Sequence, residues 1–196
     1  MSVEKKVFAE VTKTIIDNFE GGYYNPAWHH LGPLYAYSGE TMFGLDRKNF
    51  TSPSPAWKKF WAIIDSNKNQ ATWVWNYGGG FYRNQLQDLA VEIMYPVYEQ
   101  YASQTMSTKL RAIVESDPKL LLHFVYGVWN GAGWFTQFAG FLNKKVASGV
   151  VDKDLLQSYA LQSRKDSTNS IVKKSGFDME NVWAKLPTIT EIQKKS

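Results

Sequence analysis

The chain has 196 residues, of which 44% are hydrophobic and 15% aromatic, enough to bury a core in one domain or in two small lobes. It contains no cysteine, which excludes disulfide bonds, thiolate zinc sites and cysteine nucleophiles. The formal net charge of +4 arises from interspersed charges of both signs. This pattern suits an anionic envelope polymer better than a nucleic acid, which usually requires a concentrated basic stripe.

The first predicted element is a helix over residues 3–20. Apolar side chains recur every four residues and line one face: Val3, Val7, Val11, Ile15 and Phe19. Gly21 and Gly22 can adopt the left-handed conformation that ends helices, so we expect Glu20 at or beside the last helical position. The N-terminus leads into this amphipathic helix and has no apolar signal-peptide core, so export by the usual signal is not expected.

Residues 22–45 combine glycine, proline and alternating aromatic residues, and we expect an irregular or short-hairpin lobe there. A helix should then run to about residue 65, capped by Ser52 or Ser54 and followed by a polar turn at 67–70. Its predicted buried face consists of Trp57, Phe60, Trp61 and Ile64. Residues 72–75 are ambiguous, and Gly78-Gly79-Gly80 interrupts any regular element.

The second half of the chain predicts further helices, over residues 83–102, 104–115, 118–130, 133–148 and 152–172. Pro96 predicts a kink or a break near Tyr95. Asp117 and Asp152 precede two of these helices as N-caps, and Gly149 follows another as a C-cap. The tail over residues 175–196 has a weaker pattern, with apolar residues that can fold back onto the core: Phe177, Val182, Trp183 and Leu186. The expected fold class is therefore mainly α, with a helical core and a small β-hairpin or loop lobe.

Residues 120–142 contain no Asp, Glu, Lys or Arg and could be mistaken for a membrane span. His123, Asn130 and other polar residues lie within the segment, and Gly131-Ala132-Gly133 divides it. Each half has the length of an ordinary buried helix. We therefore expect two core helices joined by a glycine turn, with no stable membrane insertion and with His123 as a satisfied core histidine.

Glu20 combines several features of a general acid. A carboxylate at the C-terminal end of a helix meets the negative end of the helix dipole, which disfavours ionisation. The aromatic neighbours Phe19, Tyr23 and Tyr24 would add desolvation, which also raises the pKa of a carboxyl group. Glycosidases need an acid that keeps its proton near neutral pH. The alternative is an ordinary solvated glutamate at a helix end.

Two segments carry a resemblance to a known family. The chain reads Glu-Gly-Gly-Tyr-Tyr-Asn-Pro over residues 20–26 and Gly-Glu-Thr-Met-Phe-Gly-Leu over residues 39–45. These segments resemble phage N-acetylmuramidases (lysozymes) of glycoside hydrolase family 108. Residues 91–101, 125–133 and 138–143 resemble the C-terminal part of that family, which is described as peptidoglycan-binding.

The resemblance implies a lysozyme-like fold, with a catalytic region over residues 1–90 and a helical peptidoglycan-binding region over residues 91–196, packed as one globular unit. It implies that Glu20 protonates the leaving glycosidic oxygen and that Thr41 helps to hold the nucleophilic water. It places Asn130 in the Asn-x-Gly turn of the C-terminal part, where we expect a contact with substrate.

One departure from the family pattern affects the mechanism. Family members carry aspartate between the two motifs, whereas residues 25–39 of this chain contain no acidic residue. Glu40 and Asp46 are the nearest substitutes. An inverting hydrolase requires two carboxyl groups about 6.5–9.5 Å apart, whereas a lytic transglycosylase can work with Glu20 alone. A third alternative is a non-catalytic cell-wall-binding or virion structural protein.

Aromatic residues in loop-like surroundings are candidates for stacking on sugar rings. The predicted substrate-binding set is Tyr23, Tyr24, Trp28, Tyr35, Tyr37, Trp73, Trp75 and Tyr77. Other tryptophans follow helical patterns and are expected in the core: Trp57, Trp61, Trp129, Trp134 and Trp183. His29-His30 is a poor metal chelator without a nearby acid, so we expect no metal and no cofactor.

Taken together, the residues and the resemblance predict a peptidoglycan hydrolase that cleaves the β-1,4 bond between N-acetylmuramic acid and N-acetylglucosamine. Bacterial peptidoglycan is the expected partner, with other virion proteins as further partners and no nucleic acid. A phage enzyme of this kind would be made in the host cytoplasm and reach the periplasm and cell wall through holin pores, or it would travel in the virion.

Overall fold

The computed structural model describes residues 3–19, 22–24, 40–48, 54–69, 80–129 and 131–194. These residues are mainly helical, as predicted. The chain forms two compact units, one of residues 16–93 and the other of residues 1–15 together with 94–196. The boundaries fall within two helices, α1 (Val3–Asn18) and α4 (Arg83–Thr105), each of which contributes residues to both units.

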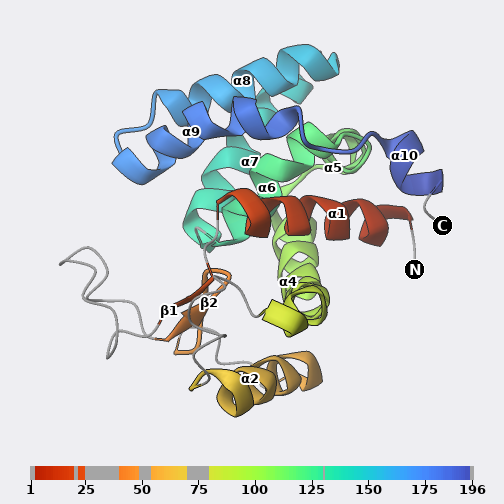
Figure 1. Cartoon of the computed structure of the whole chain (residues 1–196). Coiled ribbons are helices and arrows are strands. Elements are labelled where there is room, and N and C mark those ends of the chain that lie inside the picture. Colours follow the sequence, from red (N-terminus) through yellow and green to blue (C-terminus); the bar gives the residue numbers. More distant parts are fainter. Residues whose placement is uncertain are drawn as a thin grey trace. The chain divides into compact units, whose positions relative to one another are not determined.

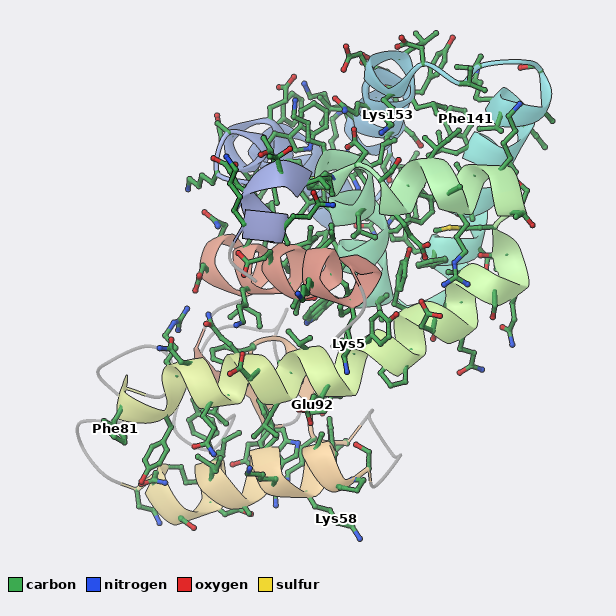
Figure 2. All side chains as sticks on the ribbon, turned by 90° about the vertical axis from the view of Figure 1, so that its right-hand side faces the viewer. Lys5, Lys58, Phe81, Glu92, Phe141 and Lys153 are labelled. Atoms are coloured by element: carbon green, nitrogen blue, oxygen red, sulfur yellow. The ribbon has the colours of Figure 1, made fainter. Side chains whose placement is uncertain are left out.

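The unit of residues 16–93 contains a three-stranded antiparallel sheet of β1 (Tyr23–Tyr24), β2 (Thr41–Met42) and β3 (Leu45–Asp46), in that order. The helix α2 (Pro55–Asn67) follows, and the short 3-10 helix η2 (Gly80–Tyr82) leads into α4. Figure 2 shows α2 running alongside the first half of α4. The expected small β lobe is therefore present.

The sequence signals around α2 are confirmed. The Ser54 hydroxyl accepts a hydrogen bond from the backbone N–H of Trp57 at 3.1 Å, as an N-cap does, and Pro55 occupies the first helical position. The predicted apolar face of Trp57, Phe60, Trp61 and Ile64 is buried. Ser54 therefore caps this helix, and Ser52 lies outside the described residues.

The turn between β2 and β3 is strained at a non-glycine residue. Phe43 has φ 53° and Gly44 has φ 70°, so both central residues occupy the left-handed region, as the tight hairpin turns require. Glycine tolerates this conformation, but for an L-residue with a Cβ it costs about 1–2 kcal/mol. The Phe43 ring is fully buried and meets the edge of Phe60 at a centroid distance of 6.3 Å. Burial of the ring therefore offsets the backbone strain.

The other unit contains the helices α5 (Thr108–Glu115), α6 (Pro118–Trp129), α7 (Ala132–Ala147), α8 (Lys153–Lys165), α9 (Ser170–Trp183) and α10 (Ile189–Lys194). Residues 120–128 of α6 are all buried, which makes this helix the centre of the core. Within the same unit, Phe8 of α1 packs against Tyr95 and Tyr98 of α4. Figure 1 shows α8 and α9 lying side by side.

Several predicted boundaries are confirmed by their caps. Asp117 and Asp152 accept hydrogen bonds from the backbone N–H groups of Leu120 and Leu155 at 2.9 and 2.8 Å. Gly149 follows α7 with φ 98°. The glycine turn within residues 120–142 is also confirmed, since Gly131 has φ 92° and separates α6 from α7. None of the helices in the described part of the chain has the length and hydropathy needed to cross a membrane.

Other boundaries differ from the prediction. The single helix expected over residues 152–172 is two helices, α8 and α9, because Ser167 and Asn169 accept backbone hydrogen bonds from Asn169 and Val172 in the turn between them. The helix α5 begins at Thr108, not at residue 104, since Ser107 caps it. Of the kink or break predicted near Tyr95, the break does not occur, since α4 continues across Pro96. In the tail, Val182 is buried as expected, but Phe177 is exposed.

Candidate functional site

The sheet connects the two motifs that the sequence singled out. β1 begins at Tyr23, directly after Glu20-Gly21-Gly22, and β2 carries Thr41. The two strands are antiparallel, with Tyr24 opposite Thr41 and Tyr23 opposite Met42. Paired residues of antiparallel strands have Cα atoms about 4.5–5.5 Å apart. The backbone therefore brings Thr41 next to the segment that follows Glu20. Glu20 itself lies outside the described residues.

The strand register separates the two candidate second carboxylates. Asp46 of β3 lies opposite Thr41, so these two side chains share one face of the sheet. The backbone N–H of Arg47 donates to the carbonyl of Glu40 at 2.9 Å and extends the ladder by one pair. Glu40 and Arg47 therefore lie on the opposite face, together with Tyr23, Met42 and Leu45. Of the two candidates, Asp46 is the one beside Thr41.

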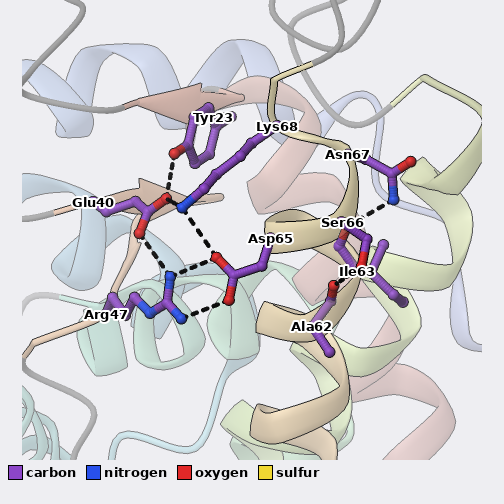
Figure 3. A network of polar contacts seen from close by, with 9 residues as sticks. All are labelled: Tyr23, Glu40, Arg47, Ala62, Ile63, Asp65, Ser66, Asn67 and Lys68. Atoms are coloured by element: carbon purple, nitrogen blue, oxygen red, sulfur yellow. Dashed lines mark hydrogen bonds and ion pairs between the residues drawn. The ribbon is translucent and has the colours of Figure 1, made fainter.

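Glu40 belongs to a network of two acids and two bases (Figure 3). One carboxylate oxygen accepts hydrogen bonds from the Tyr23 hydroxyl and from Lys68 Nζ, the latter at 2.8 Å. The other accepts from Arg47 at 2.8 Å. Arg47 also donates to both oxygens of Asp65, at 2.8 and 2.7 Å, and Lys68 lies 3.0 Å from Asp65. The network ties the sheet to the C-terminal end of α2.

The network keeps both carboxylates ionised. Burial of Glu40 by itself raises its pKa, but the hydrogen bonds from Lys68, Tyr23 and Arg47 outweigh this and hold the pKa below its usual value. The hydrogen bond from Arg47 is the main cause of the lowered pKa of Asp65. Glu40 is thus an unprotonated group whose two oxygens are engaged by three donors, which suits a structural ion pair better than a proton donor.

Asp46 has a different environment. Its side chain is buried, and Oδ1 accepts a hydrogen bond from the backbone N–H of Lys48 at 2.8 Å, a local turn of the kind that aspartate often forms. This bond fixes the side chain on the Thr41 face. Asp46 and Thr41 are therefore adjacent, with the carboxylate held in place by its own turn.

The predicted aromatic set is described only in part. Tyr23 is half-buried and uses its hydroxyl in the Glu40 network. For Tyr24 the structure describes the backbone alone. The other predicted site residues lie outside the described residues: Glu20, Trp28, Tyr35, Tyr37, Trp73, Trp75, Tyr77 and Asn130. Phe81, which projects from η2 and is 96% exposed, is a further ring of the kind that stacks on sugars (Figure 2).

The side chains of the Glu40 network could not be identified from the sequence. Arg47, Asp65 and Lys68 come from segments that are far apart in the chain, and only the Asp65–Lys68 spacing of three on a helix is a local signal. The side chains of the described residues contain no group of three His, Asp or Glu that could hold a metal ion. No protein-family model, curated protein or solved structure matches the chain.

Proposed function

We propose that the protein is a lysozyme-like muramidase, an endolysin or virion-associated lysin that hydrolyses the β-1,4 bond between N-acetylmuramic acid and N-acetylglucosamine in peptidoglycan. The observation that carries the proposal is the pairing of β1 with β2. It joins the segment after Glu20 to the strand of Thr41, so that the two motifs of the muramidase resemblance are neighbours in space.

In this mechanism Glu20 protonates the leaving glycosidic oxygen and Thr41 holds the attacking water. We assign the second carboxylate to Asp46 in preference to Glu40, since Asp46 shares a face of the sheet with Thr41. An ionised aspartate can accept a proton from the water as it attacks the sugar. Glu40 then supports the sheet through its ion pairs with Arg47 and Lys68.

A lytic transglycosylase is the second candidate. It needs only one acid, because a hydroxyl group of the sugar attacks in place of water. The engagement of Glu40 in its network and the local hydrogen bond of Asp46 favour this alternative, since neither carboxylate need then act in the reaction. The helical second half supports a role in holding peptidoglycan in either case, by its resemblance to the family's C-terminal region.

The test is digestion of purified peptidoglycan by the wild-type protein and by the Glu20→Gln variant, with mass spectrometry of the released muropeptides. The proposal requires reducing muropeptides that disappear in the variant. Glu180→Gln is the matched control, because this exposed glutamate of α9 lies outside the segments that carry the resemblance and should leave the release unchanged. Products with 1,6-anhydro ends would establish transglycosylation. No release by the wild-type protein would leave a wall-binding or virion structural role.

A further inference from the structure

Arg83 contacts two segments of the unit of residues 16–93 at once. One terminal nitrogen of its guanidinium lies 2.6 Å from Oδ1 of Asp17, in the last turn of α1. Its guanidinium carbon lies 5.3 Å from the centre of the Phe43 ring, in the turn between β2 and β3. Gln87, one turn later in α4, donates to the same Asp17 oxygen at 2.8 Å. The N-terminal end of α4 thus holds both segments.

These two segments are the ones that carry the groups assigned to the reaction. Asp17 precedes Glu20 by three positions, and the helix α1 is described to Asn18. Phe43 follows Thr41 by two positions, on the same hairpin. Loss of either contact would therefore displace a segment that lies within three residues of Glu20 or of Thr41, the groups for which we propose chemistry.

The Phe43 turn depends on such contacts. A non-glycine residue with φ 53° keeps this conformation only where its surroundings enforce it. The turn sets the register that places Thr41 opposite Asp46. A shift of that register by one residue would move Thr41 to the other face of the sheet. The residues that hold the Phe43 ring, Arg83 and Phe60, therefore help to fix the position of Thr41.

We propose that Arg83 is a positioning residue, which fixes the end of α1 relative to the Thr41 hairpin through Asp17 and Phe43. The inference rests on the proposed function. A half-exposed ion pair such as Arg83–Asp17 contributes only about 0–1 kcal/mol to stability. Misplacement of reacting groups by about 1 Å can cost 10²-fold in rate. The proposal therefore requires that replacement of Arg83 lowers kcat strongly and changes the free energy of unfolding only slightly.

The experiment compares Arg83→Gln, Arg83→Lys and wild type for kcat and KM on soluble peptidoglycan strands, with thermal unfolding of each. We expect Arg83→Gln to lower kcat by about tenfold or more with KM nearly unchanged. Arg83→Lys keeps the charge opposite Asp17 but loses the planar group over Phe43, and should recover part of the loss. The control is Arg111→Gln, which removes another ion-paired arginine, one of α5 that bonds to Glu99 and Glu115, and which should leave kcat unchanged.

Hydrogen exchange separates this inference from the proposed function. Arg83→Gln should speed amide exchange in the peptides that cover α1 residues 14–19 and hairpin residues 40–47, and Arg111→Gln should not. Unchanged exchange in both peptides, or an unchanged kcat in an active enzyme, overturns the positioning role and leaves the muramidase proposal intact. No product release by wild type overturns both.

Discussion

Arg164 of α8 donates a hydrogen bond from Nε to Nδ1 of His123 in α6 at a distance of 3.0 Å, and both side chains are fully buried. A second nitrogen of Arg164 donates to the His123 carbonyl at 2.7 Å. A third lies 3.4 Å from the Ser175 hydroxyl in α9. One arginine therefore connects three helices of the unit that contains the second half of the chain.

This arginine has no ion pair with any residue that the structure describes. The rings of Tyr126, Trp134 and Phe138 surround its guanidinium at 5.4, 5.4 and 5.7 Å. Burial lowers the pKa of Arg164 to about 10, so it stays charged at neutral pH. Because its Nε–H can only donate, Nδ1 of His123 must be unprotonated. The expected core position of His123 is confirmed, but its Nε2 finds no hydrogen-bond partner among the residues that the structure describes.

The first prediction concerns the pH dependence of stability. Burial, with the charge of Arg164 as a second cause, holds the pKa of His123 well below its usual value. Below a pH of about 6.5 the unfolded chain binds a proton at this histidine that the folded chain does not, so the free energy of unfolding falls as the pH drops. We expect a loss of about 2 kcal/mol between pH 7 and pH 5, measured by urea unfolding.

The His123→Asn variant is the control for this pH dependence. Asparagine offers an oxygen acceptor close to the position of Nδ1 and does not titrate in this range. The difference in unfolding free energy between wild type and variant should change steadily from pH 7 to pH 5, in favour of the variant. Parallel pH profiles would show that His123 is not the group responsible.

The second prediction concerns the close packing of α8 and α9. A Cβ at Gly176 of α9 would lie 3.0 Å from both Cβ of Arg164 and the backbone nitrogen of Lys165. We expect Gly176→Ala to destabilise the protein by about 1–3 kcal/mol, because one neighbour is backbone and cannot move aside. Gly140→Ala in α7 is the contrasting case, since in the described part of the chain no neighbouring residue has an atom within 4 Å of the Cβ that the alanine would add. It should stabilise by about 0.5–1 kcal/mol. Thermal unfolding checks both variants: the melting temperature should fall for Gly176→Ala and rise for Gly140→Ala.

The third prediction tests the structural role of Glu40. Its ionised form stabilises the folded state at pH values above about 4.5, and this contribution is lost as the pH falls through the lowered pKa of the folded protein. Glu40→Gln should therefore lower the free energy of unfolding by about 1–2 kcal/mol at pH 7. The difference in unfolding free energy between wild type and variant should shrink toward pH 3. A difference that is independent of pH would mean that the charge of Glu40 contributes nothing.

The fourth prediction separates the two candidate second carboxylates. In the hydrolytic mechanism Asp46→Asn should lower muropeptide release by about 10²-fold or more, since the amide keeps the acceptor for Lys48 but cannot take a proton. Glu40→Gln should retain most of the activity at a temperature where it is folded. The reverse result would assign the role to Glu40. Full activity in both variants, with anhydro products, would support the one-acid mechanism.

Local sequence patterns predicted much of the fold. The caps at Ser54, Asp117 and Asp152 and the turn at Gly131 are where the residue types placed them. These signals act within about four residues of backbone, so they can be read along the chain. The division between α8 and α9 was missed, although Ser167 and Asn169 are residues that favour turns over helix interiors.

The sequence by itself determined most of the helices, the buried face of α2 and the two motifs around Glu20 and Thr41. Only the tertiary structure decided which polar side chains meet: the ion pairs of Glu40 with Arg47 and Lys68 and of Arg83 with Asp17, and the hydrogen bond from Arg164 to His123. The reason is that a hydrogen bond or an ion pair depends on distance in space, and these partners are separated in sequence by turns whose geometry no local pattern specifies. The strand register likewise placed Asp46, and not Glu40, beside Thr41.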